Sequence, residues 1–244
     1  MTVFHLKVIA LVTMVIDHTG AALFPYQEFF VLRVIGRVAF PIFVYLVAEG
    51  FRHTKSPGWF LARLGAFAII SEPFFDWTLR RADIPWGVDF FNNTNIFYTL
   101  FLGGLAITLY KIADEKMWLL TPLPVVAAAW LARWFSTDYA AYGVVFIFAM
   151  YWFKDFNKRV AAMVLLCLWQ QRWVVQAALR YWLLDVPYAR AVDTLELMLI
   201  PATLVGVVLV LLYNGKRGPG LKWFFYAAYP AHLAVLLLIR LNYF

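Results

Sequence analysis

The sequence contains a single cysteine, Cys167, which lies in an apolar run. One cysteine excludes an internal disulfide, and it gives no indication of a cysteine-based metal site. Charged residues are also scarce. They make up 14% of the chain, whereas about a quarter is typical of a soluble domain. Hydrophobic residues make up 64%, so the composition excludes an ordinary soluble domain and indicates a membrane protein.

Common ligand-binding motifs are missing as well. The sequence has no GxxxxGKS/T phosphate loop, no GxGxxG and no HExxH. No nucleic-acid-binding module is recognisable, and the positive-inside rule for membrane proteins explains most of the net charge of +7. We therefore expect no bound metal and no nucleic-acid partner.

The apolar runs approach the length of a membrane-spanning helix and do not alternate with period two, which favours helices over a barrel. We predict an all-α, polytopic transmembrane helix bundle in one domain, residues 1–244, with eight or ten spans as alternatives to nine. The nine predicted spans are residues 6–25, 29–51, 60–79, 94–112, 118–135, 140–153, 160–184, 194–213 and 221–241.

Lysine and arginine in the short loops predict the orientation of the chain. With the N-terminus inside, about twelve basic residues fall in inner loops and about six in outer loops. The first span has neither a basic n-region nor a small-residue cleavage site, so we expect it to be retained as a helix. The predicted N-terminus is cytoplasmic and the predicted C-terminus is outside.

The pair Asp17-His18 lies inside the first predicted span. A charge in the middle of a membrane helix costs about 3 kcal/mol on insertion scales, so such residues are functional candidates. Histidine is the side chain best suited to proton transfer near neutral pH. The alternative for His18 is a bond to a neighbouring helix. For Asp17 the alternatives are helix packing, or orienting a polar neighbour and tuning His18.

Five predicted spans place ionisable groups at a similar depth, in the outer-middle of the bilayer, when each residue advances about 1.5 Å along a helix. These groups define a predicted polar layer. Its members are Asp17, His18, Arg33, Arg37, Glu72, Asp76, Arg172 and His232.

Two pairs in this layer have helical i,i+4 spacing, which puts each pair on one helix face. Arg33 and Arg37 lie in the second span, and Glu72 and Asp76 in the third. One interpretation is a structural ion pair between Arg33 and Asp76. Arg37 and Glu72 share the depth of His18, so we favour a functional role for them.

Further polar groups lie at the two ends of the predicted helices. A Gly-rich basic loop, residues 213–222, can hold an anion or can be an ordinary positive-inside turn. The loop at residues 85–95 is a predicted substrate entrance or a capping turn. The candidate groups for phosphate binding at the inner ends are Arg52, His53, Lys55, Lys216, Arg217 and Lys222.

Several blocks, in order along nearly the whole chain, resemble the TraX family, which is named for the acetylase of F-type pilin. Its first-helix signature, (M/L)-x-x-D-H, is similar to residues 14–20. The similar blocks are residues 14–20 (MVIDHTG), 37–43 (RVAFPIF), 49–54 (EGFRHT), 71–76 (SEPFFD), 95–100 (NIFYTL), 138–144 (DYAAYGV), 213–218 (YNGKRG) and 225–233 (FYAAYPAHL).

The resemblance implies an acetyltransferase of the bacterial inner membrane that uses cytoplasmic acetyl-CoA. The implied acceptor is an amine or hydroxyl of pilin or, by a looser likeness to glycan-modifying membrane acyltransferases, of a surface glycan. His18 would be the general base, with Asp17 or Glu72 orienting it and Arg37 or His232 stabilising the oxyanion. The candidate acceptor contacts are Arg33, Asp76, Asn92, Asn95 and Tyr229.

Two other function classes remain open from the sequence. A proton-coupled transporter or flippase would use the same acids and histidines as a relay, although no inverted repeat is recognisable. A structural assembly factor for surface fibres would use the polar layer only to hold its helices together.

Overall fold

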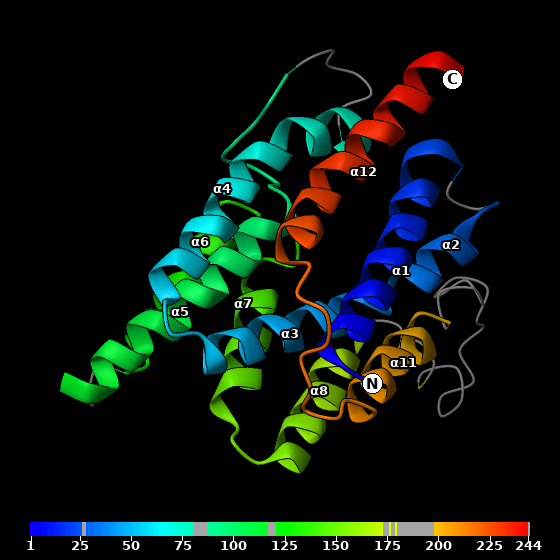
Figure 1. The fold of residues 1–244 in the computed structure, drawn as a ribbon. Helices are drawn as coiled ribbons and strands as arrows, with labels where there is room; N and C mark the ends of the chain where they lie inside the picture. The colour runs from blue at the N-terminus through cyan, green and yellow to red at the C-terminus, as the bar shows by residue number, and fades with distance from the viewer. Residues whose placement is uncertain are drawn as a thin grey trace. The chain divides into compact units, whose positions relative to one another are not determined.

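The computed structural model describes residues 1–25, 28–80, 87–116, 121–172, 176, 179 and 198–243. Within these residues the protein is all-helical and contains no strand (Figure 1). The elements are α1 (Val3–Leu23), α2 (Phe30–Gly36), α3 (Ala39–His53), α4 (Pro57–Phe75), the π-helix η1 (Asp76–Arg80), α5 (Ile96–Lys116), α6 (Leu123–Trp134), α7 (Ala140–Trp152), α8 (Phe156–Gln170), α11 (Leu199–Leu211) and α12 (Lys222–Tyr243). The predicted helical fold is confirmed.

Four helices of the described chain are long and apolar enough to cross a membrane. They are Val3–Leu23, Phe30–His53, Ile96–Ala113 and Lys222–Asn242. Three shorter apolar helices, α6, α7 and α11, also coincide with predicted spans. The count of nine spans and the cytoplasmic N-terminus stay predictions.

Two prolines interrupt the helices of the predicted spans 29–51 and 60–79. Between α2 and α3, Arg37 and Val38 form a turn, because Pro41 has no N–H to donate to the carbonyl of Arg37 and its ring crowds that carbonyl. Pro73 lies inside α4, and the chain continues from Phe75 into a π-helical turn that begins at Asp76. Such turns are typical sites of local distortion in helices.

Polar side chains fix where several helices begin. The Thr2 hydroxyl accepts a hydrogen bond from the His5 N–H, and the His5 ring accepts one from the Thr2 N–H, which together form a capping box for α1. Asn95 Oδ1 accepts the Phe97 N–H at 2.9 Å at the start of α5. Asp155 Oδ1 accepts the Lys158 N–H at 2.9 Å at the start of α8. These caps satisfy N–H groups that the helices themselves leave without partners.

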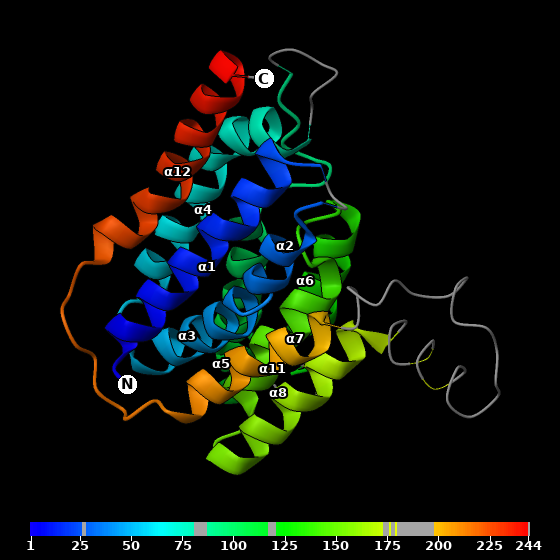
Figure 2. The same ribbon diagram turned by 90° about the vertical axis from the view of Figure 1, so that its right-hand side faces the viewer.

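The described chain forms two compact units. Unit 1 comprises Met1–Phe43 and Val160–Pro219. In this unit α1 packs along α2, which lie side by side in both Figure 1 and Figure 2. Gly206 of α11 lies so close to the turn after α2 that an added Cβ would be 2.6 Å from the carbonyl oxygen of Val38. Small residues at such contacts allow membrane helices to approach closely.

Unit 2 comprises Val44–Arg159 and Gly220–Phe244. Helices α5, α6 and α7 pack around a core, and α4 contacts both α5 and α12. Just beyond α4, in η1, the Thr78 hydroxyl donates to the Leu233 carbonyl at 3.1 Å. Arg240 donates in turn to the Thr78 carbonyl at 2.9 Å. The buried residues of the core cluster are Leu102, Ala106, Ala128, Ala132 and Val144.

Candidate functional site

Charged residues of the first two helices meet inside unit 1. Arg33 Nη1 lies 2.9 Å from Asp17 Oδ2 and donates to the Asp17 carbonyl at 3.0 Å. Arg37 Nη2 lies 3.9 Å from Asp17 Oδ1. The three side chains are only 17% to 23% exposed, so water screens these pairs weakly. Asp17 therefore orients two cations and holds α2 against α1.

Two glycines make this arrangement sterically possible. A Cβ added to Gly36 would overlap the side chain of Asp17. One added to Gly20 would lie 2.8 Å from the Cβ of Leu32. The missing side chains let α1 and α2 approach until the carboxylate reaches both guanidinium groups.

His18 follows Asp17 on α1 and is half-buried. Successive side chains on a helix point about 100° apart, so the direction of Asp17 does not set that of His18. The predicted role of His18 as a base stays a prediction. So does the ion pair between Arg33 and Asp76, because those residues belong to different units.

Basic groups gather at the beginning of α1, also within unit 1. The loop that follows α11 lies against the first turn of this helix: the Val3 N–H donates to the Lys216 carbonyl at 2.9 Å, and the Phe4 N–H to the Arg217 carbonyl at 3.2 Å. Lys7, one turn further along, is close enough to Arg217 for their charges to interact. Both loop side chains are exposed. The loop thus directs its carbonyls to α1 and leaves cationic side chains for an anion.

Glu72 and Asn95 form a buried polar cluster in unit 2, and both are 0% exposed. Glu72 Oε2 accepts the Asn95 backbone N–H at 3.0 Å and the side-chain Nδ2 at 2.5 Å. The same Nδ2 also donates to the Ala68 carbonyl at 2.8 Å. Because Asn95 also caps α5, one side chain fixes the carboxylate and the start of the next helix together.

Asp76 and the loop before α5 form the outer part of this cluster. Asp76 Oδ2 accepts the Asp89 N–H at 2.7 Å. Asp89 Oδ1 in turn accepts the Asn92 N–H at 3.1 Å. Asn92 is exposed and Asp76 is fully buried. The two predicted acceptor contacts therefore belong to one hydrogen-bonded chain that runs from the surface inward.

A second loop is tied to the same region. The Asp138 N–H donates to the Thr94 carbonyl at 2.9 Å, and the Thr99 hydroxyl bonds both Thr137 Oγ1, at 2.8 Å, and the Asp138 carbonyl. Tyr139 has a φ of 62°, a left-handed conformation that is uncommon for a residue other than glycine. Strained conformations of this kind persist where the surrounding contacts hold them.

Tyr229 and His232 line the α12 side of this region. Their ring centroids are 5.4 Å apart, and the Phe97 ring meets the Tyr229 ring edge-on at 5.2 Å. Tyr229 interacts electrostatically with Glu72. His232 Nδ1 is 2.9 Å from the Ala228 carbonyl, so in the neutral ring Nδ1 carries the proton and Nε2 is the acceptor. Unit 2 thus brings together four predicted site residues: Glu72, Asn95, Tyr229 and His232.

A charged network closes the other end of unit 2. Glu49 Oε2 lies 3.1 Å from Arg159 Nη1 and 3.8 Å from Arg52 Nε, while Glu49 Oε1 lies 3.1 Å from His53 Nε2. Arg52 Nη2 donates to the carbonyls of Met150, Tyr151 and Phe153. These carbonyls terminate α7, where a cation is favourable.

These contacts give Arg52 a capping role, and its predicted phosphate contact stays a prediction. Arg159 was not among the residues predicted from the sequence. It follows Lys158 in a basic run of the kind that the positive-inside rule explains. Lys55 and Lys222 are exposed, and the ammonium of Lys222 lies 5.0 Å from the centroid of the Trp223 ring.

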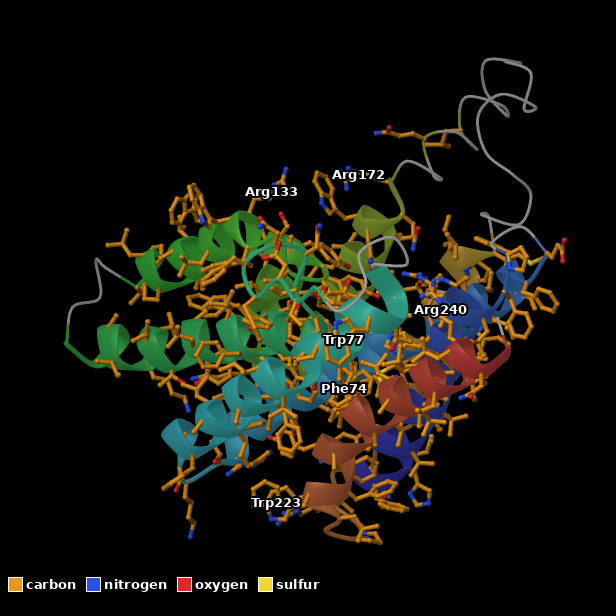
Figure 3. All side chains as sticks on the ribbon, turned by 90° about the horizontal axis from the view of Figure 1, so that it is seen from above. Phe74, Trp77, Arg133, Arg172, Trp223 and Arg240 are labelled. Carbon is orange, nitrogen blue, oxygen red and sulfur yellow. The ribbon has the colours of Figure 1, made fainter. Side chains whose placement is uncertain are left out.

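Arg172 was predicted to join the polar layer. It is exposed, donates to the Trp169 carbonyl at 3.3 Å and stacks on the Trp169 ring at 5.3 Å. Figure 3 labels its side chain beside the end of α8. These contacts join Arg172 to a residue one helical turn away. That Arg172 lies at the same membrane depth as His18 stays a prediction.

The fold and these clusters define an all-helical protein with apolar helices fit for a membrane and with charged residues paired inside them. Large apolar side chains are exposed along α6, including Val126 at 62% and Trp134 at 67%, as expected of a lipid-facing helix. The chain matches the family model described as TraX protein over residues 4–240. It therefore belongs to the TraX family.

Two relatives extend this finding. Over 245 residues the chain is 30% identical to the probable fimbrial assembly protein FimC, serogroup H1, of Dichelobacter nodosus, with 96% of this chain and 93% of that protein covered. It is 25% identical over 136 residues to the uncharacterized protein RP591 of Rickettsia prowazekii (strain Madrid E), with 55% of this chain and 48% of that protein covered. No solved structure matches the chain.

Proposed function

We propose that the protein is a membrane-embedded acetyltransferase that moves an acetyl group from acetyl-CoA to an amine or hydroxyl acceptor. Membership of the TraX family supports this proposal. The relative named as a probable fimbrial assembly protein favours a pilin acceptor over a surface glycan. The proposed location is the bacterial inner membrane, with the N-terminus in the cytoplasm.

One observation carries the proposal: a single helix, α1, joins a cationic end to a candidate base. Lys7, Lys216 and Arg217 gather near its beginning, and His18 follows Lys7 by 11 residues, or about 17 Å along the helix. Cations recognise the phosphates of CoA. The flexible pantetheine arm can then extend along α1 toward His18 and carry the thioester.

The proposed step is a direct transfer. The acceptor nitrogen or oxygen attacks the thioester carbonyl carbon while His18 takes the proton of the acceptor. The C–S bond then breaks, the CoA thiolate leaves, and the proton passes from His18 to that thiolate. The products are the acetylated acceptor and CoA, and His18 returns to its neutral form.

Arg37 is the better of the two arginines for stabilising the oxyanion of this step. Arg33 makes two short contacts to Asp17, at 2.9 and 3.0 Å, whereas the contact of Arg37 is longer, at 3.9 Å. The short contacts commit Arg33 to Asp17, and we assign to Arg37 the stabilisation of the negative charge that develops on the thioester oxygen. Glu72 and His232 belong to unit 2, so they can act in this step only if they lie near His18 of unit 1.

The test is transfer of labelled acetyl from acetyl-CoA in membranes that contain the full chain. The His18→Ala variant is expected to lose at least about 100-fold in rate, the usual contribution of a general base. His5→Ala is the matched control on the same helix, because His5 is exposed and bonds to Thr2 in the capping box. Near-normal transfer by the His18→Ala variant would remove His18 as the base.

Binding is measured separately from transfer. Lys216→Ala is expected to weaken acetyl-CoA binding about fivefold, as an exposed charge contact would, while His18→Ala should bind acetyl-CoA normally. A proton flux through the purified protein without acetyl-CoA binding would replace the proposal with a proton-coupled transporter that uses the buried Glu72 and Asp76.

A further inference from the structure

Helices α4 and α12 begin at the same end of unit 2. The Arg63 guanidinium lies 5.9 Å from the Tyr226 ring centroid, and the Phe67 ring stacks on the Tyr226 ring at 5.2 Å. Further along, Thr78 bonds to Leu233. Contacts therefore advance along both helices together, so α4 and α12 run in the same direction, as Figures 1 and 2 also show.

Basic and aromatic side chains gather where these two helices begin. Trp59 precedes Arg63 by four residues on α4, and Lys222 precedes Tyr226 by four residues on α12, so each shares a helix face with a residue of the interhelical contact. Trp59 is 72% exposed and Trp223 is 61% exposed. Figure 3 shows Trp223 projecting at the beginning of α12. We call Lys55, Trp59, Arg63, Lys222 and Trp223 the α4–α12 basic patch.

No acidic residue lies in the first four turns of α4 or in α12. The sequence has neither Asp nor Glu in residues 50–71 or in residues 197–244. The two helix beginnings add their own positive partial charge. In contrast, the nearby basic residues Arg52 and Arg159 are paired with Glu49. The α4–α12 basic patch is thus suited to an anion.

The surface beyond the patch is apolar. On α12 the exposed residues Phe224, Val235 and Leu238 follow one stripe, and they are 56%, 54% and 60% exposed. On α4, Ile70 is 50% exposed and lies two turns beyond Arg63. A soluble anion needs no such surface, whereas the acyl chains of a lipid do. Tryptophan beside a cation is also the pattern found where membrane helices meet headgroups.

We infer that the α4–α12 basic patch binds the headgroup of an anionic phospholipid whose acyl chains lie along α4 and α12. The phosphodiester contacts Arg63 and Lys222, and the indole N–H groups of Trp59 and Trp223 donate at the level of the glycerol backbone. This assigns Lys222 to lipid and not to the phosphates of CoA. The site is independent of acetyl transfer.

The test uses native mass spectrometry of the full chain in mild detergent, titrated with phosphatidylglycerol or with phosphatidylcholine. Phosphatidylglycerol is expected to be retained more tightly. Lys222→Gln and Arg63→Gln should each lower its affinity about fivefold, the usual contribution of one basic group near an anionic lipid surface. Lys158→Gln, which removes an exposed lysine of the same unit, is the matched control and should change nothing.

Three results would overturn the inference. Equal retention of the two lipids would exclude charge recognition. An equal loss in the Lys158→Gln variant would reduce the effect to net charge. Displacement of phosphatidylglycerol by acetyl-CoA, or equally tight retention of inorganic phosphate, would make the patch a site for a soluble anion. Lys222 is exposed, so its variant keeps the test decisive if Arg63→Gln does not fold.

Discussion

Asp17 has two arginine partners that lie at different distances from its carboxylate. Arg33 makes a charged contact and a carbonyl contact to it near 3 Å, and Arg37 Nη2 lies 3.9 Å from its carboxylate. Removing one member of a largely buried pair leaves the other charge without compensation, which is costly. A guanidinium poised for an oxyanion acts on the rate of transfer instead. We therefore expect a substitution of Arg33 to act mainly on stability and a substitution of Arg37 to act mainly on the rate of transfer.

The first prediction compares Arg33→Gln with Arg37→Gln. Arg33→Gln should lower the free energy of unfolding by about 3 kcal/mol, because it leaves Asp17 with only the longer contact. Arg37→Gln should lower it by less, because the contact of Arg37 to Asp17 is the longer one, and should slow acetyl transfer about 100-fold in kcat. Unfolding in detergent by urea and labelled-acetyl transfer are the two measurements. Equal effects of both variants on both quantities would contradict this division of roles.

Elements in this protein meet through positions where a side chain is missing. Gly36 ends α2 directly over Asp17, so that any larger residue there displaces the carboxylate. Gly58, in the first turn of α4, has open space around it. Both glycines lie in a terminal turn of a helix, but Gly36 is closely packed and Gly58 is not.

The second prediction compares alanine at these two positions. Gly36→Ala should separate α1 from α2 and lower the free energy of unfolding by about 1–3 kcal/mol, the usual effect of overpacking. Gly58→Ala should be neutral or stabilising by about 0.5–1 kcal/mol, because alanine favours the helix. Chemical denaturation of the two variants in the same detergent decides the matter. If Gly36→Ala leaves the free energy of unfolding unchanged, the close contact of Asp17 with α2 does not contribute to stability.

The sequence was sufficient to predict the helices but not their partners. Apolar run length located most of the described elements within a few residues, while much of the second half of the predicted span 160–184 lies outside the described residues. Pro41 and Pro73 already carried the signal for the two interruptions. Spacing along a helix determines which residues share a face, but not which faces meet. Depth counting therefore placed Arg37 level with His18 yet could not reveal that both arginines reach Asp17.

The bond between Glu72 and Asn95 shows a second limit. Asn95 was predicted as a substrate contact in a polar loop, and the structure uses it to cap α5 and to hold the Glu72 carboxylate. Only the path of the loop brings these groups together. Arg159 was missed for a related reason: a basic residue after a turn has the same sequence pattern whether it marks topology or pairs with Glu49.

At the scale of the whole molecule, helix length conflicts with the predicted number of spans. Helix α7 has 13 residues, which rise about 20 Å against a hydrocarbon core of about 30 Å. A short helix can still cross if the bilayer thins or if flanking residues reach the interface. Arg133 before α7 and Lys158 after it are exposed. Helix α7 crosses the membrane if Arg133 and Lys158 lie on opposite sides of it.

The third prediction uses single cysteines in a Cys167→Ser background, in spheroplasts treated with a membrane-impermeant maleimide. Arg133→Cys and Asn242→Cys should react in intact spheroplasts, because both positions are predicted to lie outside. Lys158→Cys and Lys216→Cys should react only after permeabilisation, since positive loops stay in the cytoplasm. Reaction of Arg133→Cys and Lys158→Cys from the same side would show that α7 does not cross and would remove the nine-span topology. Reaction of Lys216→Cys in intact spheroplasts would be more serious, because cytoplasmic acetyl-CoA could not then reach the cationic beginning of α1.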